Sequence, residues 1–309
     1  MLKKGELAVT AECGPPKGAD PEAILRKADL LQGKVDAINV TDNQTAIVRM
    51  SSLAACSLLV SRGLEPVLQV VVRDRNRIAL QSDMLGASAL GIRNVLCLSG
   101  DHQCLGNQPQ ALGVFDLDSI QLVQTLKTMR DEGTIWGGEP LTKPPHLFIG
   151  AAANPFADPL PLRAIRLAKK IRAGADFIQT QCVYNLKRFK EWMNLITDRG
   201  LTEKTSILAG VTPLKSSGMA HYMRNKVAGM DIPDAIIKRR EGAPKQRQRE
   251  EGIKICVETI QRLKEIQGVR GFHIMAIEWE EVVGEIVERA GLLPRPSLDQ
   301  DQKRFFYVV

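Results

Sequence analysis

The chain has 309 residues, of which 44% are hydrophobic and 25% charged, with a formal net charge of +7. This composition is typical of a soluble globular protein, and the length suits one α/β barrel. No segment approaches the roughly 18 consecutive apolar residues of a membrane span. A strand pattern starts within a few residues of Met1 and leaves no room for a signal peptide. We therefore expect a cytoplasmic protein that does not enter a membrane.

Charge and cysteine usage exclude further classes. Much of the basic excess lies in residues 237–249, which indicate a solvated helical junction or a surface for an anionic partner. Aromatic residues make up only 5% and are not interleaved with the basic ones, so we expect no nucleic-acid binding. The six cysteines form no Cys-x-x-Cys pair and no zinc-type cluster with histidine, so we expect reduced thiols and no metal site.

Apolar runs and amphipathic segments alternate along the chain. Asp20 and Pro21 are typical of a helix start, and Gly174 is typical of a helix end. The predicted strands are residues 7–13, 36–42, 66–72, 94–100, 146–153, 177–182, 206–212 and 271–278. The first predicted helix begins at Pro21, and the last follows Glu278. Between them, helices are predicted at about 44–62, 76–90, 118–132, 158–173, 186–198 and 246–266. Eight repeats predict a closed parallel eight-stranded sheet, a single (β/α)8 TIM barrel domain over residues 1–309.

Two connections are longer than a barrel requires. They are residues 101–117, after the fourth predicted strand, and residues 213–245, which contain three prolines. Long loops in compact domains tend to carry function. We therefore interpret both as lid or partner-docking segments.

Three apolar runs end in a polar side chain that a buried strand does not need: Glu12, Asp101 and Gln181. The carboxyl ends of barrel strands meet at the face where catalysis occurs. Glu12 suits a general acid, or it forms a salt bridge to a neighbouring Lys or Arg. Asp101 follows Ser99-Gly100 and is a ligand contact or an N-cap. Gln181 matches the paired edge of a pterin, or it is bonded to backbone.

Other polar residues near predicted strand ends have two interpretations each. Thr41, Asp42, Asn43 and Gln44 are a polar strand exit or a helix N-cap. Gln69 lies among Val and Leu and needs a partner. His273 is a base or a satisfied core histidine. Because no phosphate-binding glycine loop is present, a nucleotide cofactor must be held at strand ends and helix N-termini.

In order along the chain, Thr-Ala-Glu-Cys-Gly-Pro-Pro, Val-Thr-Asp-Asn, Leu-Ser-Gly-Asp, Ala-Gly-Ala-Asp-Phe-Ile-Gln-Thr-Gln, Gly-Val-Thr-Pro and Gly-Phe-His-Ile resemble the motifs of the methylenetetrahydrofolate reductase family. Each motif is short, but six in register over nearly the whole chain are specific. The resemblance implies a flavin-containing barrel that reduces 5,10-methylenetetrahydrofolate to 5-methyltetrahydrofolate, by hydride transfer from reduced flavin.

The resemblance also implies roles for individual residues. Glu12 corresponds to the acid that helps open the folate ring, and Asp101 to an aspartate near flavin and folate, so both are implied to be catalytic. Asp101, Thr180, Gln181 and His273 are implied to bind the folate. The implied flavin contacts, FAD or FMN, are Thr41, Asp42, Asn43, Gln69, Ser99, Gly100, Asp101, Val114, Phe115, Ala152 and Lys170.

Three departures from the family pattern concern the flavin and the electron donor. Ser99 stands where the family has Arg, and Gln69 where it has His. A Phe that stacks on folate or nicotinamide in bacterial relatives falls near Ser217. These changes make the chain most similar to members from anaerobes that work with a separate iron–sulfur subunit. NAD(P)H or such a subunit is therefore the implied donor, and an oligomer or hetero-complex is expected. The alternatives are a pterin-binding methyltransferase barrel and a non-catalytic subunit of an electron-transfer complex.

Overall fold

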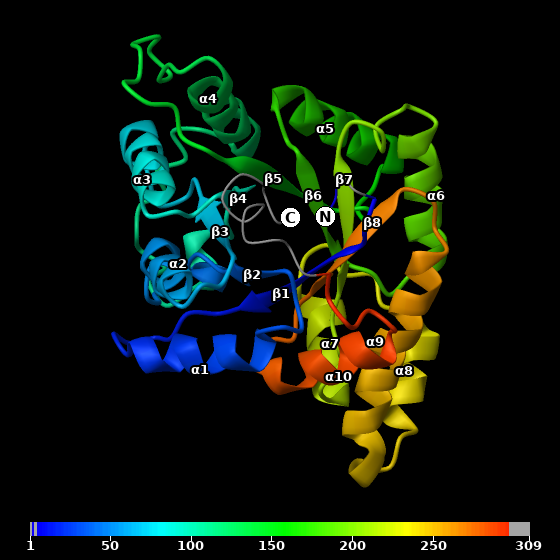
Figure 1. Cartoon of the computed structure of the whole chain (residues 1–309). Helices are drawn as coiled ribbons and strands as arrows, with labels where there is room; N and C mark the ends of the chain where they lie inside the picture. The colour runs from blue at the N-terminus through cyan, green and yellow to red at the C-terminus, as the bar shows by residue number, and fades with distance from the viewer. Residues whose placement is uncertain (1, 3–4, 297–309) are drawn as a thin grey trace.

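The structure is a computed structural model that describes Leu2 and residues 5–296. Within these residues, eight parallel strands close into a barrel in chain order (Figure 1). The strands are β1 (Ala8–Cys13), β2 (Ala37–Val40), β3 (Pro66–Val71), β4 (Asn94–Leu98), β5 (Phe148–Ala153), β6 (Phe177–Cys182), β7 (Ser206–Val211) and β8 (Val269–Ile274). The predicted TIM barrel is confirmed; the last residues of the predicted domain, 297–309, lie outside the described part.

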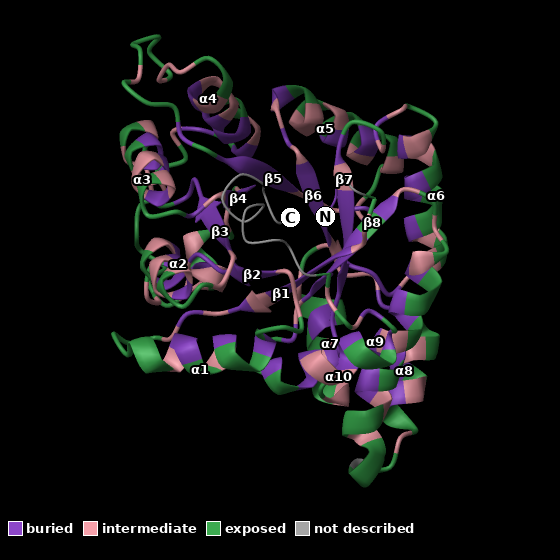
Figure 2. Ribbon diagram, in the orientation of Figure 1, coloured by how far each residue is buried: buried purple, intermediate pink, exposed green. Residues whose placement is uncertain are grey.

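Helices surround the barrel (Figure 1). Their buried sides face the strands and their exposed sides face outward (Figure 2). The α-helices are α1 (Pro21–Leu31), α2 (Ser52–Ser61), α3 (Arg77–Ala89), α4 (Ser119–Asp131), α5 (Leu160–Ala173), α6 (Leu186–Thr197), α7 (Ser217–Lys226), α8 (Asp234–Glu241), α9 (Gln248–Lys264) and α10 (Val283–Arg289). Every helix in the described part is too short or too polar to cross a membrane.

The helix boundaries follow local chemistry. Asp20 caps α1 by accepting from the Glu22 backbone N–H, and Asp118 and Gln121 form a capping box at α4. Gly174 ends α5 at a φ of 119°, a left-handed conformation that favours glycine. All six cysteines are free thiols.

The prediction for residues 44–62 was wrong at its start. Helix α2 begins only at Ser52, with Ser51 as its N-cap, and Gln44–Ala46 form a short 3₁₀ turn instead. Asn43, Thr45 and Ala46 have positive φ values of 44°, 56° and 56°. Left-handed backbone at three positions excludes a continuous helix there.

The prediction of residues 213–245 as one long loop was also wrong. This segment contains α7 and α8, and the chain between them, residues 227–233, is short. Helix α8 and the start of α9 extend beyond the ring of helices at the bottom of Figure 1. Residues 101–117 contain only the 3₁₀ turn Gln103–Leu105 and are a loop, as predicted.

The inside of the barrel is layered. The lower layer is apolar and consists of Ala8, Ala37, Val67, Leu96, Phe148, Phe177 and Leu208, with Leu2 packed against it. Gly150 makes room for this layer, because a Cβ there would lie 2.2 Å from the Phe177 ring. Further along the strands the interior becomes polar. The candidate site therefore lies above a solid apolar floor.

Candidate active site

A cavity of about 350 Å³ opens at the carboxyl ends of the strands. Residues from β1, β3, β4, β5, β6, β8 and α5 line it. Of the residues proposed from the sequence, it brings together Glu12, Gln69, Ala152, Lys170, Thr180, Gln181 and His273. Leu96, Leu98 and Met275 supply apolar walls. A mixed lining of this kind, with few convergent polar groups, is typical of a small-molecule site.

Glu12 faces this cavity from the end of β1, and 11% of its side chain is exposed. Gln44 Nε2 donates to Glu12 Oε1 at 3.2 Å, and His273 Nε2 lies 3.9 Å from Glu12 Oε2. Among the described residues, Glu12 is not paired with Lys or Arg, so the salt-bridge alternative was wrong. A carboxyl held by an amide and an imidazole at a cavity wall can exchange a proton with a ligand.

Gln181 lines the same cavity from β6, although it is far from Glu12 in the sequence. Its Oε1 accepts from the Cys182 backbone N–H at 3.1 Å, and its Nε2 donates to the Ala228 carbonyl at 3.3 Å. The strand register shifts here, and Thr180 Oγ1 accepts from the Gly210 backbone N–H at 3.0 Å. The alternative that Gln181 is bonded to backbone is confirmed. Gln181 also faces the cavity, and its contact with a pterin stays a prediction.

One side of the cavity is cationic. Arg163, Arg166 and Lys170, at helical spacing on α5, all line it. Lys170 donates to the Ala152 carbonyl rather than to a carboxylate. Burial, and to a lesser extent Arg166, lowers the pKa of Lys170 to about 8. Arg163 Nε is buried without a hydrogen-bond partner among the described residues. This wall is suited to an anionic group.

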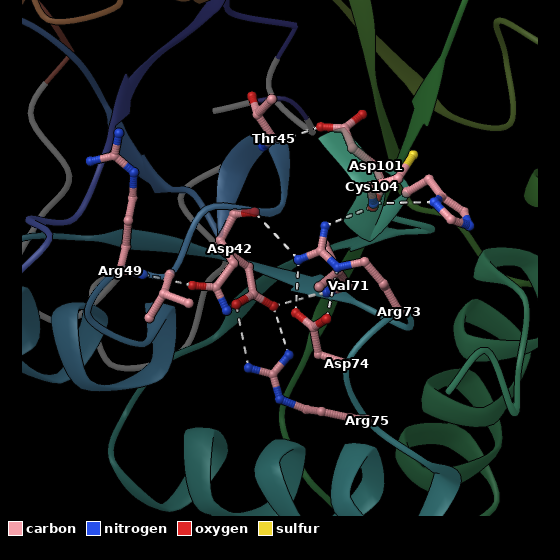
Figure 3. A network of polar contacts seen from close by, with 12 residues as sticks. Asp42, Thr45, Arg49, Val71, Arg73, Asp74, Arg75, Asp101 and Cys104 are labelled. Carbon is pink, nitrogen blue, oxygen red and sulfur yellow. Dashed lines mark hydrogen bonds and ion pairs between the residues drawn. The ribbon is translucent and has the colours of Figure 1, made fainter. Parts of the chain in front are cut away.

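A second set of proposed residues forms a separate polar cluster, which we call the loop cluster (Figure 3). Its centre is Arg73, just after β3, whose side chain is 3% exposed. Arg73 donates to the carbonyls of Asp101, at 2.8 Å, and Asn43, at 3.3 Å, and pairs with Asp74. Asp42 accepts from the Val71 backbone N–H and pairs with Arg75. The loops after β2, β3 and β4 are thereby tied together.

Asp101 belongs to this loop cluster and does not line the cavity. Its Oδ2 accepts from the Thr45 backbone N–H at 3.1 Å, across to the loop after β2. The Asp101 side chain is therefore bonded to a distant loop and is not a local N-cap. Asp101 follows the carboxyl end of β4, at the end of the barrel where the cavity opens.

The remaining proposed residues also lie outside the cavity lining. Thr41 is buried, and its Oγ1 has no hydrogen-bond partner among the described residues. Ser99 Oγ donates to Ser119 Oγ at the start of α4. The space beside Gly100 is taken by Val71 and Arg73, at 3.1 Å and 3.2 Å from where a Cβ would stand. Val114 and Phe115 are each 44% exposed.

The sequence interpretation missed several residues. Thr10, Asn39 and Gln179 form a buried polar layer beneath Glu12 and Gln181. The strand period of two could have indicated two of them. Thr10 stands two residues before Glu12, and Gln179 two residues before Gln181, so each pair shares a face of its strand. Arg163 and Arg166 were also missed, although their spacing to Lys170 places them on one face of a helix. Among the described residues, no group of three or more His, Cys, Asp or Glu could hold a metal ion.

The profile of one protein family, "Methylenetetrahydrofolate reductase", matches residues 1–291. The chain belongs to the methylenetetrahydrofolate reductase family. It is 25% identical to methylenetetrahydrofolate reductase 2 of Schizosaccharomyces pombe over 225 residues, 68% of this chain and 33% of that protein. It is 23% identical to the probable methylenetetrahydrofolate reductase (NADPH) of Caenorhabditis elegans over 255 residues, 79% of this chain and 35% of that protein. The chain thus spans about a third of the length of these relatives.

Solved structures agree on the fold of this family member. A protein from Clostridium thermocellum that binds two copies of 5-methyl-5,6,7,8-tetrahydrofolic acid matches with a TM-score of 0.62 and 16% identity, over 99% of this chain and 98% of that chain. A 2,3-dimethylmalate lyase matches with a TM-score of 0.51 and 12% identity, over 99% and 90% of the two chains. Identities this low support the barrel alone.

Proposed function

We propose that this protein reduces 5,10-methylenetetrahydrofolate to 5-methyltetrahydrofolate with a bound flavin. The observation that carries the proposal is that Glu12 and Gln181, 169 residues apart, face one cavity in a member of this family. The folate-binding C. thermocellum protein, which shares the barrel over nearly its whole length, adds support.

The residues present fit a flavin. Gln69, Leu96 and Leu98 offer an amide and apolar walls to a flat ring, and the cavity volume lies within the range of small-molecule sites. Lys170, with Arg163 and Arg166, would hold the phosphate end of FMN or FAD. Thr41 Oγ1 is buried without a hydrogen-bond partner in the part of the chain that the structure describes, and is a candidate further polar contact. When bound, the flavin supplies the hydride that reduces the methylene carbon.

The chain's own residues bind the folate and move the proton. Gln181, with Thr180 beside it, holds the donor–acceptor edge of the pterin. Glu12 gives its proton to the folate nitrogen that leaves the methylene carbon, and so opens the five-membered ring. Asp101 lies outside the cavity lining, and its carboxyl group would favour the positive charge that develops on the folate. Ala152 lines the flavin side of the site. The other flavin contacts implied by the resemblance lie outside the lining and stay predictions: Thr41, Asp42, Asn43, Ser99, Gly100, Val114 and Phe115.

The electron donor is NAD(P)H or a separate iron–sulfur protein, as the resemblance implies. A donor that works as a protein partner has two loops to contact at this end of the barrel. These are residues 101–117, where Leu105 and Leu112 are 63% and 93% exposed, and residues 227–233 between α7 and α8.

The test is direct. The full chain is purified, its visible spectrum is recorded, and any released chromophore is identified by mass spectrometry. The protein is then mixed anaerobically with 5-methyltetrahydrofolate, which should bleach the oxidised flavin in the reverse reaction. NADH, NADPH and a reduced iron–sulfur protein are tested next as donors. A colourless protein that does not take up FAD or FMN contradicts the proposal, and methyl transfer without a flavin would establish the methyltransferase alternative.

A further inference from the structure

Four polar side chains fill the barrel interior directly beneath Glu12. Thr10, Asn39, Gln179 and His273, from β1, β2, β6 and β8, are each at most 3% exposed. Buried polar groups are destabilising unless they are hydrogen-bonded. Here they are bonded to one another, and the direction of each bond can be worked out from how many hydrogens each group carries.

The amides of Asn39 and Gln179 pair with each other. Asn39 Nδ2 donates to Gln179 Oε1 at 2.7 Å, and Gln179 Nε2 donates to Asn39 Oδ1 at 3.2 Å. An amide nitrogen carries two hydrogens. The second hydrogen of Gln179 Nε2 is directed to Thr10 Oγ1 at 3.3 Å. The Thr10 hydroxyl is therefore an acceptor from Gln179.

The hydroxyl hydrogen of Thr10 is then free for its remaining neighbour. Thr10 Oγ1 lies 2.9 Å from His273 Nδ1. If Thr10 donates this bond, Nδ1 is the unprotonated nitrogen of a neutral imidazole, and Nε2 carries the hydrogen. The bond from the Gln179 amide thus favours the Nε2–H tautomer of His273, because it leaves the Thr10 hydroxyl hydrogen to donate to Nδ1.

The opposite side of the imidazole agrees with this tautomer. His273 Nε2 faces Glu12 Oε2 at 3.9 Å, and once Glu12 has given up its proton, its carboxylate can only accept hydrogen bonds. The distance exceeds that of a hydrogen bond. Catalytic contacts are often long before the ligand is bound and shorten in the complex. Both neighbours of the imidazole, Thr10 and Glu12, therefore favour a hydrogen on Nε2.

We propose that His273 is a positioning residue for Glu12, held as the Nε2–H tautomer by Gln179 and Thr10. This rests on the proposed function. When the O–H bond of Glu12 breaks and an N–H bond forms on the folate, the electron pair stays on the carboxylate. The Nε2–H of His273 then donates to that carboxylate and keeps it directed into the cavity. A proton from water restores the acid.

The tautomer can be measured without any activity assay. In the full chain labelled with ¹⁵N-histidine, long-range proton–nitrogen NMR spectra distinguish Nε2–H from Nδ1–H. The chain has only four histidines, and the signal that His273→Gln removes identifies His273. We expect Nε2–H in the unchanged protein. A wild-type Nδ1–H tautomer overturns the proposal whether or not the protein is a reductase.

Thr10→Val removes the hydroxyl and keeps the shape, and Thr10→Ser is the matched control that keeps the hydroxyl. We expect the valine variant to show a mixture of tautomers and about a tenfold lower kcat with KM nearly unchanged, as the loss of one well-placed hydrogen bond allows. The serine variant should retain both the tautomer and kcat. An unchanged tautomer in Thr10→Val, or an unchanged kcat, overturns the proposal. If the valine variant does not fold, the wild-type tautomer still decides.

Discussion

The side-chain amide of Gln181 donates to the backbone carbonyl of Ala228 at 3.3 Å, and so bonds the cavity wall to the α7–α8 connection. The next residue, Gly229, has a φ of 80°, and a Cβ there would lie 2.0 Å from Asn154 Nδ2. Asn154 also lines the cavity. Residues 227–233 thus contact the site at two points. The Gln181 amide, which is proposed to bind the pterin, is bonded to Ala228 in this structure.

Gly229→Ala should loosen this contact, because alanine is strained at positive φ and would collide with Asn154. A folate would then no longer have to displace Ala228 from Gln181. We expect 5-methyltetrahydrofolate to bind up to about tenfold more tightly, the value of one hydrogen bond. Isothermal titration calorimetry measures this affinity. Gly218→Ala is the control, because a Cβ there meets only Ser216 Oγ at 3.8 Å. Equal affinity of Gly229→Ala and the unchanged protein would contradict the prediction.

Glu12→Gln should keep the shape of the site and remove its acid. We expect flavin content to remain normal and folate turnover to fall by about 100-fold or more, as for loss of a general acid. Glu278→Gln is the matched control, since its side chain is 75% exposed. Flavin absorbance and steady-state turnover are compared in the two variants. Normal turnover in Glu12→Gln would remove Glu12 from the proposed mechanism.

Lys170→Met tests the cationic wall. Burial lowers the pKa of Lys170 from 10.5 to about 8, which corresponds to roughly 3 kcal/mol against the charged form. Between these values the unfolded chain binds more protons than the folded one, so the stability of the flavin-free protein should rise with pH from about 8 to about 10.5. Urea unfolding measures this rise, which Lys170→Met should abolish.

The same variant should bind flavin more weakly, because the phosphate loses a cation. Lys169→Met, at an exposed neighbouring position, is the control and should change neither property. If both lysine variants keep the pH dependence and the flavin affinity of the unchanged protein, Lys170 is not part of an anion site.

Arg73→Met should separate the three loops of the loop cluster. Arg73 is almost wholly buried and bonds to Asp74 and to the carbonyls of Asn43 and Asp101. The Asp74 side chain is 36% exposed and can be hydrated, so the main loss is the bonds to the two carbonyls, and we expect a loss of about 2 kcal/mol in the free energy of unfolding. Urea unfolding measures it, and Arg62→Met, at an exposed position, is the control. A loss no larger than in the control would show that the loops are held by other contacts.

The sequence by itself determined the barrel and half of the candidate site. Apolar runs, Asp20 and Gly174 act through contacts within a few residues, so the element order could be predicted from local chemistry. Glu12 and Gln181 stand at the carboxyl ends of strands, and the parallel topology brings all such ends to one face. Their meeting therefore needed no knowledge of the loops.

Only the tertiary structure decided where the loop residues lie. Asp101 is held away from the cavity by the Thr45 backbone and by Arg73, partners 56 and 28 residues distant. The left-handed backbone at Thr45 and the hydrogen bond from Gln181 to the Ala228 carbonyl likewise depend on long-range contacts. Hydrogen bonds between loops have no periodicity in sequence, so no local pattern could indicate them. The strands that carry Glu12 and Gln181, in contrast, are indicated by their own apolar residues.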